Sequence, residues 1–215
     1  MTLPSLIGKW QKKATVTRLK RTYTVLAQAV QRSIADYGDP SGWGTEGYYD
    51  SEATPENLQK IVESFSSTYI VPYLAKVKKA EWGSFADLGY KEIKDGSYAV
   101  PIVARDGKMI ILNDGTVLQI RMSTHNLGTD EDRDDRYTSI IIYADINGLR
   151  GPNWVGKDIF MFMVDSKTGK FDFYGYHGYD ITREQVYSTC KANAVTCGRL
   201  IILDGWEIKD DYPWW

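Results

Sequence analysis

Cysteine and histidine are scarce in this sequence of 215 residues, which contains two of each. Two thiols are too few for a disulfide-built scaffold or for a four-thiolate zinc site. The sequence also lacks any run of eighteen apolar residues, so as it stands it predicts no membrane-spanning helix. Residues 1–7 are too few to hold the regions of a signal peptide. A disordered chain is excluded, because 43% of the residues are hydrophobic and can form a core.

Acidic residues are absent from positions 1–35, which hold seven lysines and arginines. The remaining 180 residues therefore carry 19 basic and 28 acidic residues, a net charge of −9. A basic arm of +7 is joined to an acidic body, which indicates two environments. Such an arm suits nucleic acid or an anionic membrane, but its bases also lie on a helix with an apolar opposite face, where they would simply be solvated.

The basic arm has the apolar spacing of a long helix. Steps of three and four residues mark its buried stripe, which consists of Val16, Leu19, Tyr23, Leu26, Val30, Ile34 and Tyr37. Leu3, Ile7, Trp10 and Ala14 continue this spacing towards the N-terminus, with a shift near Ala14. The sequence Gly38-Asp39-Pro40 ends the helix. A helix of roughly thirty residues is about 45 Å long, so one end is expected to project from a domain of this size.

The rest of the chain predicts one more helix and then a sheet. Residues 38–54 read as a loop, and Thr54 and Pro55 have the types favoured at the start of a helix, which Pro72 ends. From about Tyr98 the apolar period changes to two. Strands are predicted at 99–104, 109–112, 117–122, 139–144, 158–164, 170–174 and 200–203, with a short helix at 182–191. The predicted fold is α+β, with a helical segment 1–38 packed on the mostly antiparallel sheet of a globular head, 39–215.

Three oxygen-bearing residues suggest a metal site. Asp145 and Asn147 stand at the first and third positions of a half calcium loop, and Asp158 follows. The EF-hand pattern is incomplete, because Leu149 and Gly156 occupy its fifth and twelfth positions. The competing interpretation is a crossover between two strands in which these side chains accept local backbone N–H bonds.

Motifs of catalysis and nucleotide binding are weak. The segment 42–47 matches G-x-G-x-x-G, but it follows a helix where the dinucleotide motif requires a strand. No G-x-S-x-G elbow occurs, and neither His125 nor His177 has a recognisable partner, so the sequence argues against an enzyme. Cys190 and Cys197 either form a disulfide in an oxidising compartment or remain two reduced thiols.

Several motifs resemble one bacterial family. The segments 2–7 and 11–23 look like the place where a prepilin's hydrophobic N-terminal helix becomes amphipathic. The elements D-x-N-G-x-x-G-P-N (145–153) and D-G-W…D-Y-P-W (204–214) are similar to those of type IV pilin-like and type II secretion pseudopilin-like proteins. That family also has a basic leader, a Gly-Phe-Thr-Leu-x-Glu processing site and an apolar half-helix. These are absent, so we expect a truncated chain or an internal start.

The resemblance implies a pilin-like fold and a structural subunit of a type IV pilus or a type II secretion pseudopilus. Assembly with other subunits would use Leu3, Leu6, Ile7 and Trp10. Lys9, Lys12 and Lys13 would lie near the lipid–water boundary of the inner membrane in the full-length form. Export makes a Cys190–Cys197 disulfide plausible. The head would be periplasmic or extracellular, with no nucleic-acid partner and no cofactor apart from the hypothesised calcium at Asp145, Asn147 and Asp158.

Two alternatives remain open at this stage. The chain would be a minor pilin if its head binds a glycan or a surface ligand through the loop aromatics Trp43, Tyr48, Tyr49 and Trp154. A secreted hydrolase would instead need a cleft with two suitably separated carboxylates. Open exposure of the aromatic rings favours the first alternative, and their burial favours a scaffold.

Overall fold

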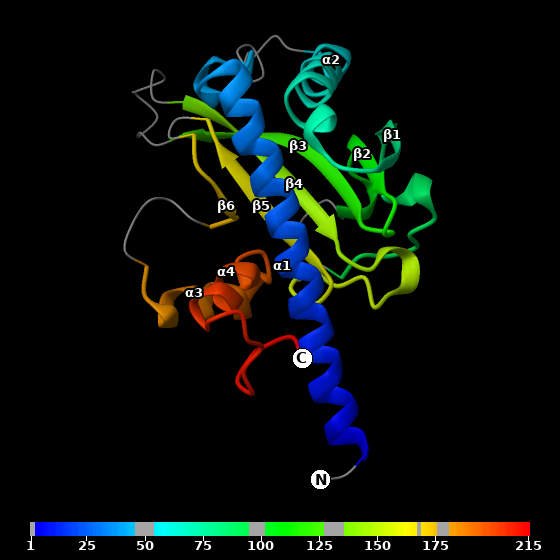
Figure 1. Cartoon of the computed structure of the whole chain (residues 1–215), viewed down its shortest axis with the longest axis vertical. Coiled ribbons are helices and arrows are strands. Elements are labelled where there is room, and N and C mark those ends of the chain that lie inside the picture. Colours follow the sequence, from blue (N-terminus) through cyan, green and yellow to red (C-terminus); the bar gives the residue numbers. More distant parts are fainter. Residues whose placement is uncertain (1–2, 46–53, 95–101, 127–135, 167–168, 176–180) are drawn as a thin grey trace.

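The computed structural model describes residues 3–45, 54–94, 102–126, 136–166, 169–175 and 181–215. Its architecture is α+β, in which the long helix α1 (Leu3–Tyr37) crosses one face of an antiparallel sheet (Figure 1). The helix is continuous through the predicted register shift near Ala14, because neither glycine nor proline interrupts it after Gly8.

Six strands form the sheet in the order of the sequence, and every neighbouring pair is antiparallel. The strands are β1 (Val77–Gly83), β2 (Gly107–Leu112), β3 (Val117–Asn126), β4 (Arg136–Asp145), β5 (Ile159–Asp165) and β6 (Phe171–Phe173). This meander confirms the predicted α+β class and its antiparallel sheet.

Three shorter helices complete the fold: α2 (Pro55–Phe65), α3 (Arg183–Asn193) and α4 (Cys197–Leu203). The predicted start of α2 is confirmed, since the Thr54 hydroxyl accepts from the Asn57 N–H at 3.3 Å. A capping box starts α3, in which the Thr182 and Gln185 side chains each accept from the other's backbone N–H. Further turns are a π-helical turn at Ser66–Ile70 and 3-10 turns at Pro40–Gly42, Val71–Tyr73, Ala86–Leu88, Ile102–Ala104 and Gly148–Arg150.

The C-terminal half of α1, which is its upper half in Figure 1, packs on the sheet through an aromatic cluster. Tyr23 lies with its ring centroid 5.3 Å from that of Phe171, 5.4 Å from that of Phe173 and 6.3 Å from that of Phe162. The Trp206 ring meets Tyr23 edge-on at 5.5 Å, so the C-terminal segment joins the same cluster. The cluster continues into a row of fully buried side chains across β3 to β6, made up of Ile120, Ile142, Phe162 and Phe173. The core therefore lies between α1 and this face of the sheet.

The structure corrects two sequence predictions and adds one strand that was not predicted. Residues 200–203 form the end of helix α4 instead of a strand. Their four successive apolar side chains have no period that separates a buried strand from a buried helix. Residues 102–104 of the predicted strand 99–104 form a 3-10 turn, and 99–101 lie outside the described residues. Strand β1 was not predicted, because this edge strand carries lysines in place of an apolar alternation.

Tyr23→Ala is expected to lower the free energy of unfolding by about 3 kcal/mol, because it leaves a cavity among four aromatic rings. Urea denaturation followed by circular dichroism measures this loss. Trp10→Ala is the matched control on the same helix, and since this side chain is 68% exposed, its effect should stay within about 0.5 kcal/mol. Equal losses for the two variants would contradict the packing described for α1.

Candidate functional site

The N-terminal end of α1 projects beyond the head (Figure 1) and carries exposed apolar side chains. Leu6 and Ile7 are each 49% exposed, and Trp10 is 68% exposed. The side chain of Leu3, in the first turn of the same helix, lies outside the described residues. The predicted assembly residues whose side chains are described are therefore open to contact, while their role in assembly stays a prediction.

A groove of about 960 Å³ lies between α1 and the C-terminal tail, residues 204–215. Its apolar lining comes from Val16 and Val25 of the helix and from Trp206 and Ile208 of the tail. Its charged lining consists of Lys9, Lys12, Lys13, Lys20, Arg21, Glu207 and Asp210. The groove thus combines apolar walls with an excess of positive charge, which suits a partner that has both apolar and acidic groups.

Two lysines of α1 contact the tail at this groove. Lys12 Nζ lies 3.0 Å from Asp210 Oδ1 and also donates to the Lys209 carbonyl at 3.2 Å. Lys20 Nζ lies 5.7 Å from the centroid of the Trp206 ring. The Asp210 carboxylate is fully exposed, so the ion pair adds little stability and mainly orients the two side chains.

A charged network holds the tail against α3, and sequence reasoning missed it. The Arg183 guanidinium donates to both oxygens of Asp204, at 2.6 and 2.9 Å, and to Asp211 at 3.0 Å. Lys209 Nζ lies 2.8 Å from Asp204 Oδ1. Burial opposes the charge of Asp204, but the hydrogen bonds from Arg183 and Lys209 outweigh it and lower the pKa of this carboxyl. The D-G-W…D-Y-P-W element contains both acids, whereas nothing in the sequence spacing indicates Arg183 as their partner.

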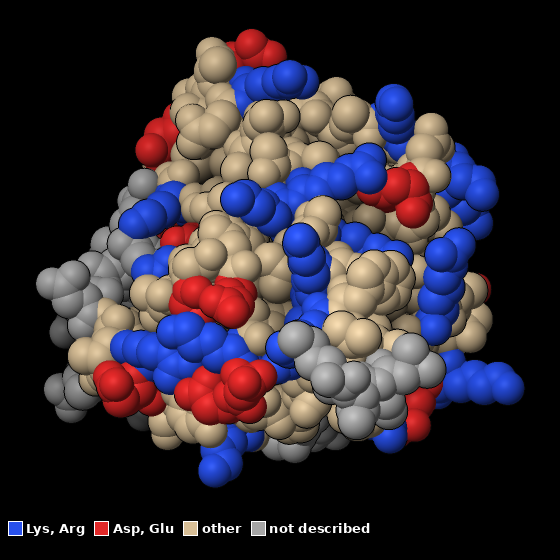
Figure 2. All heavy atoms as spheres, turned by 60° about the horizontal axis from the view of Figure 1, so that its bottom comes forward, with Lys and Arg blue, Asp and Glu red and all other residues tan. Residues whose placement is uncertain are grey.

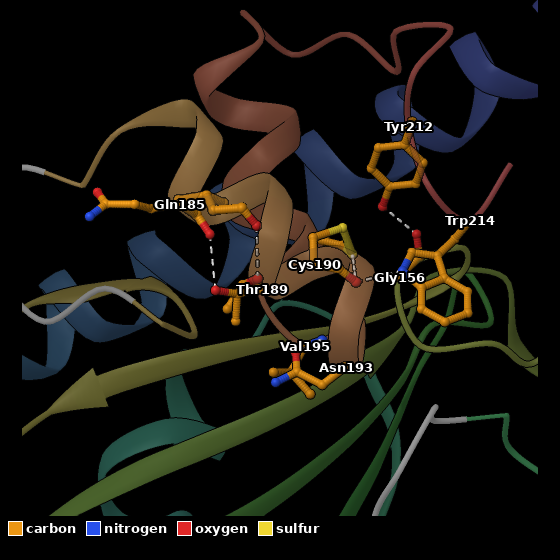
Figure 3. The surroundings of a disulfide bond; sticks show 11 residues. Gly156, Gln185, Thr189, Cys190, Asn193, Val195, Tyr212 and Trp214 are labelled. Atoms are coloured by element: carbon orange, nitrogen blue, oxygen red, sulfur yellow. Dashed lines mark hydrogen bonds between the residues drawn. A yellow bond between two sulfur atoms is a disulfide. The ribbon is translucent and has the colours of Figure 1, made fainter.

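A disulfide between Cys190 and Cys197 links α3 to α4 (Figure 3). The Cα atoms are 4.7 Å apart, and both residues are fully buried. Trp214 Nε1 donates to the Cys190 carbonyl at 2.7 Å, and the Tyr212 hydroxyl donates to the Gly156 carbonyl. The tail is therefore bound both to the disulfide-linked helices and to the loop that precedes β5.

Asp145, at the end of β4, holds the turn that follows it. Its Oδ1 accepts from the backbone N–H groups of Asn147 and Gly148, each at 2.9 Å. The Tyr90 hydroxyl donates to its Oδ2 at 2.7 Å. Burial raises the pKa of Asp145 to about 7, and the nearby Asp158 carboxyl adds to this rise, while the three hydrogen bonds oppose it.

Asp158 holds the loop before β5 by accepting hydrogen bonds from its backbone N–H groups. The Trp154 N–H donates to Oδ1 at 2.7 Å, and the Asn153 N–H donates to Oδ2 at 2.9 Å. The Asn147 side-chain amide also donates to Oδ2, at 3.3 Å, and to the Gly151 carbonyl at 3.0 Å. Burial raises the pKa of Asp158 as well. Asp145, Asn147 and Asp158 are thus brought together, and their hydrogen bonds follow the crossover interpretation.

The three residues do not fit a calcium ion as they are arranged. All four carboxylate oxygens accept N–H or O–H donors, which a metal ion would have to displace. Within the described part of the chain, the side-chain oxygens of Asn147 and Asn153 are buried without a hydrogen-bond partner. Two such oxygens fall short of the six to eight ligands that calcium takes. Melting in the presence of calcium chloride, described below, tests whether the ion displaces these hydrogen bonds.

The loop aromatics proposed for ligand binding do not share one exposed surface. Trp43 is 1% exposed and stacks on Tyr69 at 4.9 Å, with its Nε1 donating to the Gly38 carbonyl at 3.0 Å. Its assignment to an exposed loop was therefore wrong. Trp154 is partly exposed. Tyr48 and Tyr49 lie outside the described residues, as do His177 and the side chain of His125.

Replacing both cysteines by alanine is expected to lower the free energy of unfolding by about 2–3 kcal/mol, because the short closed loop no longer restricts the unfolded chain. Urea denaturation of the variant and of the oxidised wild type measures the difference. Wild type treated with a reductant serves as the control and should lose a similar amount. A variant as stable as the oxidised protein would mean that the disulfide contributes nothing.

Asp145 is expected to make stability fall as the pH rises. Its pKa is about 7 in the folded protein, against 3.8 for an unperturbed aspartic acid side chain, so unfolding releases a proton between these values. The free energy of unfolding should therefore decrease across this range by up to about 1.4 kcal/mol per pH unit. Urea denaturation at several pH values measures the slope.

Asp145→Asn is the matched variant, because an amide oxygen can still accept from the Asn147 and Gly148 N–H groups without titrating. It should flatten the slope, and an unchanged slope would assign the pH dependence to other groups.

The same melts with calcium chloride test the metal hypothesis. We expect no change in Tm, and a rise that Asp158→Asn abolishes would contradict the fit described above.

Comparisons with known proteins give a family and no function. No described helix is long and apolar enough to cross a membrane. No curated protein and no protein of solved structure matches the chain. A match is found with a family described as "Family of unknown function (DUF6613)", and it covers residues 5–215. Because the match spans almost the whole sequence, the chain belongs to this family.

Proposed function

We propose that this chain is a pilin-like structural subunit that assembles through α1 into a type IV pilus or a type II secretion pseudopilus. The observation that carries the proposal is the division of one continuous helix. Its C-terminal half packs on the sheet through Tyr23 and the neighbouring aromatic rings. Leu6, Ile7 and Trp10 at the N-terminal end are exposed. Exposed apolar side chains on a projecting helix mark a surface that is normally covered by a partner.

The charges support a second copy of the chain as that partner. The first 35 residues carry seven bases and no acid, whereas the remainder carries a net charge of −9. A helical assembly that places the arm of one copy beside the head of another brings opposite charges together. The groove between α1 and the tail adds an apolar floor for such a contact. The resulting role is assembly without catalysis, in the cell envelope, with the head exported.

The alternatives have weaker support from the described residues. A ligand-binding minor pilin would expose its loop aromatics, but Trp43 lies in the core. A hydrolase would need accessible carboxylates, and the closely placed Asp145 and Asp158 are at most 3% exposed with every oxygen hydrogen-bonded. Neither alternative gives a role to the exposed apolar side chains at the N-terminal end of α1.

Photo-crosslinking in the native host tests the assembly. Benzoylphenylalanine at Ile7 or Trp10, introduced into the chromosomal gene, is expected to give a ladder of crosslinked multiples of the subunit. Because the arm and the head carry opposite charges, the ladder should weaken when the cells are crosslinked in high salt. Immunoblotting with an antibody against the head measures the products.

Leu203 is the matched control position, since it is also an exposed large apolar residue, at 39%, but lies on the head. Benzoylphenylalanine there should give far less crosslinking between copies. If Ile7 and Trp10 produce no multiples, or no more than Leu203 does, the assembly proposal fails.

A further inference from the structure

A second hollow, of about 450 Å³, lies on the opposite side of α1 from the tail groove, where the lower helix meets the loop between β4 and β5. Trp10, Arg18, Arg150, Lys157 and Trp215 contribute to its lining. Leu149, which is 57% exposed, stands directly before Arg150 in the Gly148–Arg150 turn. We call these six residues the basal surface. Figure 2 views this end of the molecule and shows lysine and arginine side chains scattered over it, with several acidic side chains among them.

The bases of the basal surface are not neutralised. Among the described residues, Arg18, Arg150 and Lys157 form no ion pair, and the same holds for the neighbouring Lys94. The acid in the lining is Asp158, which is 3% exposed and whose oxygens accept three N–H groups. The surface therefore presents positive charge to an external partner.

Tryptophan rings stand among these bases. Lys157 Nζ lies 5.2 Å from the ring centroids of both Trp154 and Trp215, and Lys94 Nζ lies 4.7 Å from that of Trp154. The cation–π contacts hold the ammonium groups beside rings that remain partly exposed. Trp10 completes the set as the most exposed of the large apolar side chains described.

We infer that the basal surface contacts the anionic headgroups of a lipid bilayer. Tryptophan prefers the boundary between headgroups and acyl chains, where its apolar ring and its N–H are both satisfied. Lysine and arginine at the same level are attracted by anionic lipid, and exposed apolar residues such as Leu149 add burial at the boundary. A small soluble anion would match the charges but would leave Trp10 and Leu149 exposed.

This inference deepens the proposed function, on which it rests in one respect: a subunit seated in a membrane before assembly would hold this end of the head against the bilayer. The surface differs from the assembly residues at every position except Trp10. The vesicle experiment below leaves Trp10 unchanged and needs only the purified chain, whereas the crosslinking experiment depends on the native host. Failure of one proposal is therefore distinguishable from failure of the other.

Vesicle co-sedimentation tests the surface. The purified chain is mixed with vesicles of phosphatidylcholine alone or of phosphatidylcholine with phosphatidylglycerol. We expect binding to the anionic vesicles that is lost in high salt, and little binding to the neutral ones. Each base near an anionic surface contributes about fivefold to partitioning, so Arg150→Gln with Lys157→Gln should weaken it about 25-fold. Leu149→Ser should weaken it about fivefold by removing apolar burial.

The matched control is Arg32→Gln with Lys60→Gln, which removes the same charge from exposed positions on upper α1 and on α2, at the other end of the molecule (Figure 1). Its binding should stay within about twofold of wild type, since screened charges far from the bilayer contribute little. Lys157→Gln also removes cation–π contacts, so Arg18→Gln with Arg150→Gln provides a second basal variant. Thermal melts verify that each variant is folded.

Three results would overturn the inference. One is equal binding to neutral and anionic vesicles, or none to either. Another is an equal effect of the basal and control variants, which would indicate general charge attraction. The third is displacement of the chain from anionic vesicles by millimolar glycerol phosphate, which would assign the hollow to a small soluble anion.

Discussion

The packing of Tyr23 against the β5–β6 aromatic residues is the contact on which the remaining structure depends. It presses the upper half of α1 onto the sheet and draws Trp206 of the tail into the same cluster. Because the helix has 35 residues and only its upper half is covered in this way, its lower end must extend past the head. The exposed apolar end, the tail groove and the basal surface all follow from where this one contact places the helix.

Buried carboxylates and the tail then shape the lower end of the head. Asp145 and Asp158 use their oxygens to close two adjacent turns, which sets the backbone that carries Arg150, Trp154 and Lys157. The tail is joined to the same loop through Tyr212 and to α3 through the Arg183 network and the disulfide-linked helices. The residues for which the sequence suggests a calcium site thus hold two loops through their hydrogen bonds.

Local signals in the sequence were reliable where local physics decides the outcome. The spacing of Leu19, Leu26 and Val30 predicted the buried face of α1, and Thr54 and Thr182 predicted two helix starts that their side-chain hydrogen bonds confirm. Sequence predictions were wrong or missing where residues distant in the sequence determine the local structure. Residues 200–203 became helical against Phe173, which Gly198 allows α4 to approach closely. Strand β1 forms because β2 pairs with it, although its lysines interrupt the apolar alternation that predicts a strand. Trp43 is buried because Phe65 and Tyr69 lie against it.

The sequence by itself determined the α+β class, the long basic helix, the order of its main elements and the separation of charge between arm and body, since all of these depend on residue types and short-range periods. Only the tertiary structure decided that Arg183 would meet Asp204 and Asp211, and that Trp10 would share a surface with Arg150 and Trp215. These pairs are separated by between 21 and more than 200 positions, and no local pattern encodes such contacts. Trp10, Arg150 and Trp215 meet because packing the helix on the sheet brings the two ends of the chain and the β4–β5 loop to one place. Arg183 meets both acids because the tail lies against α3.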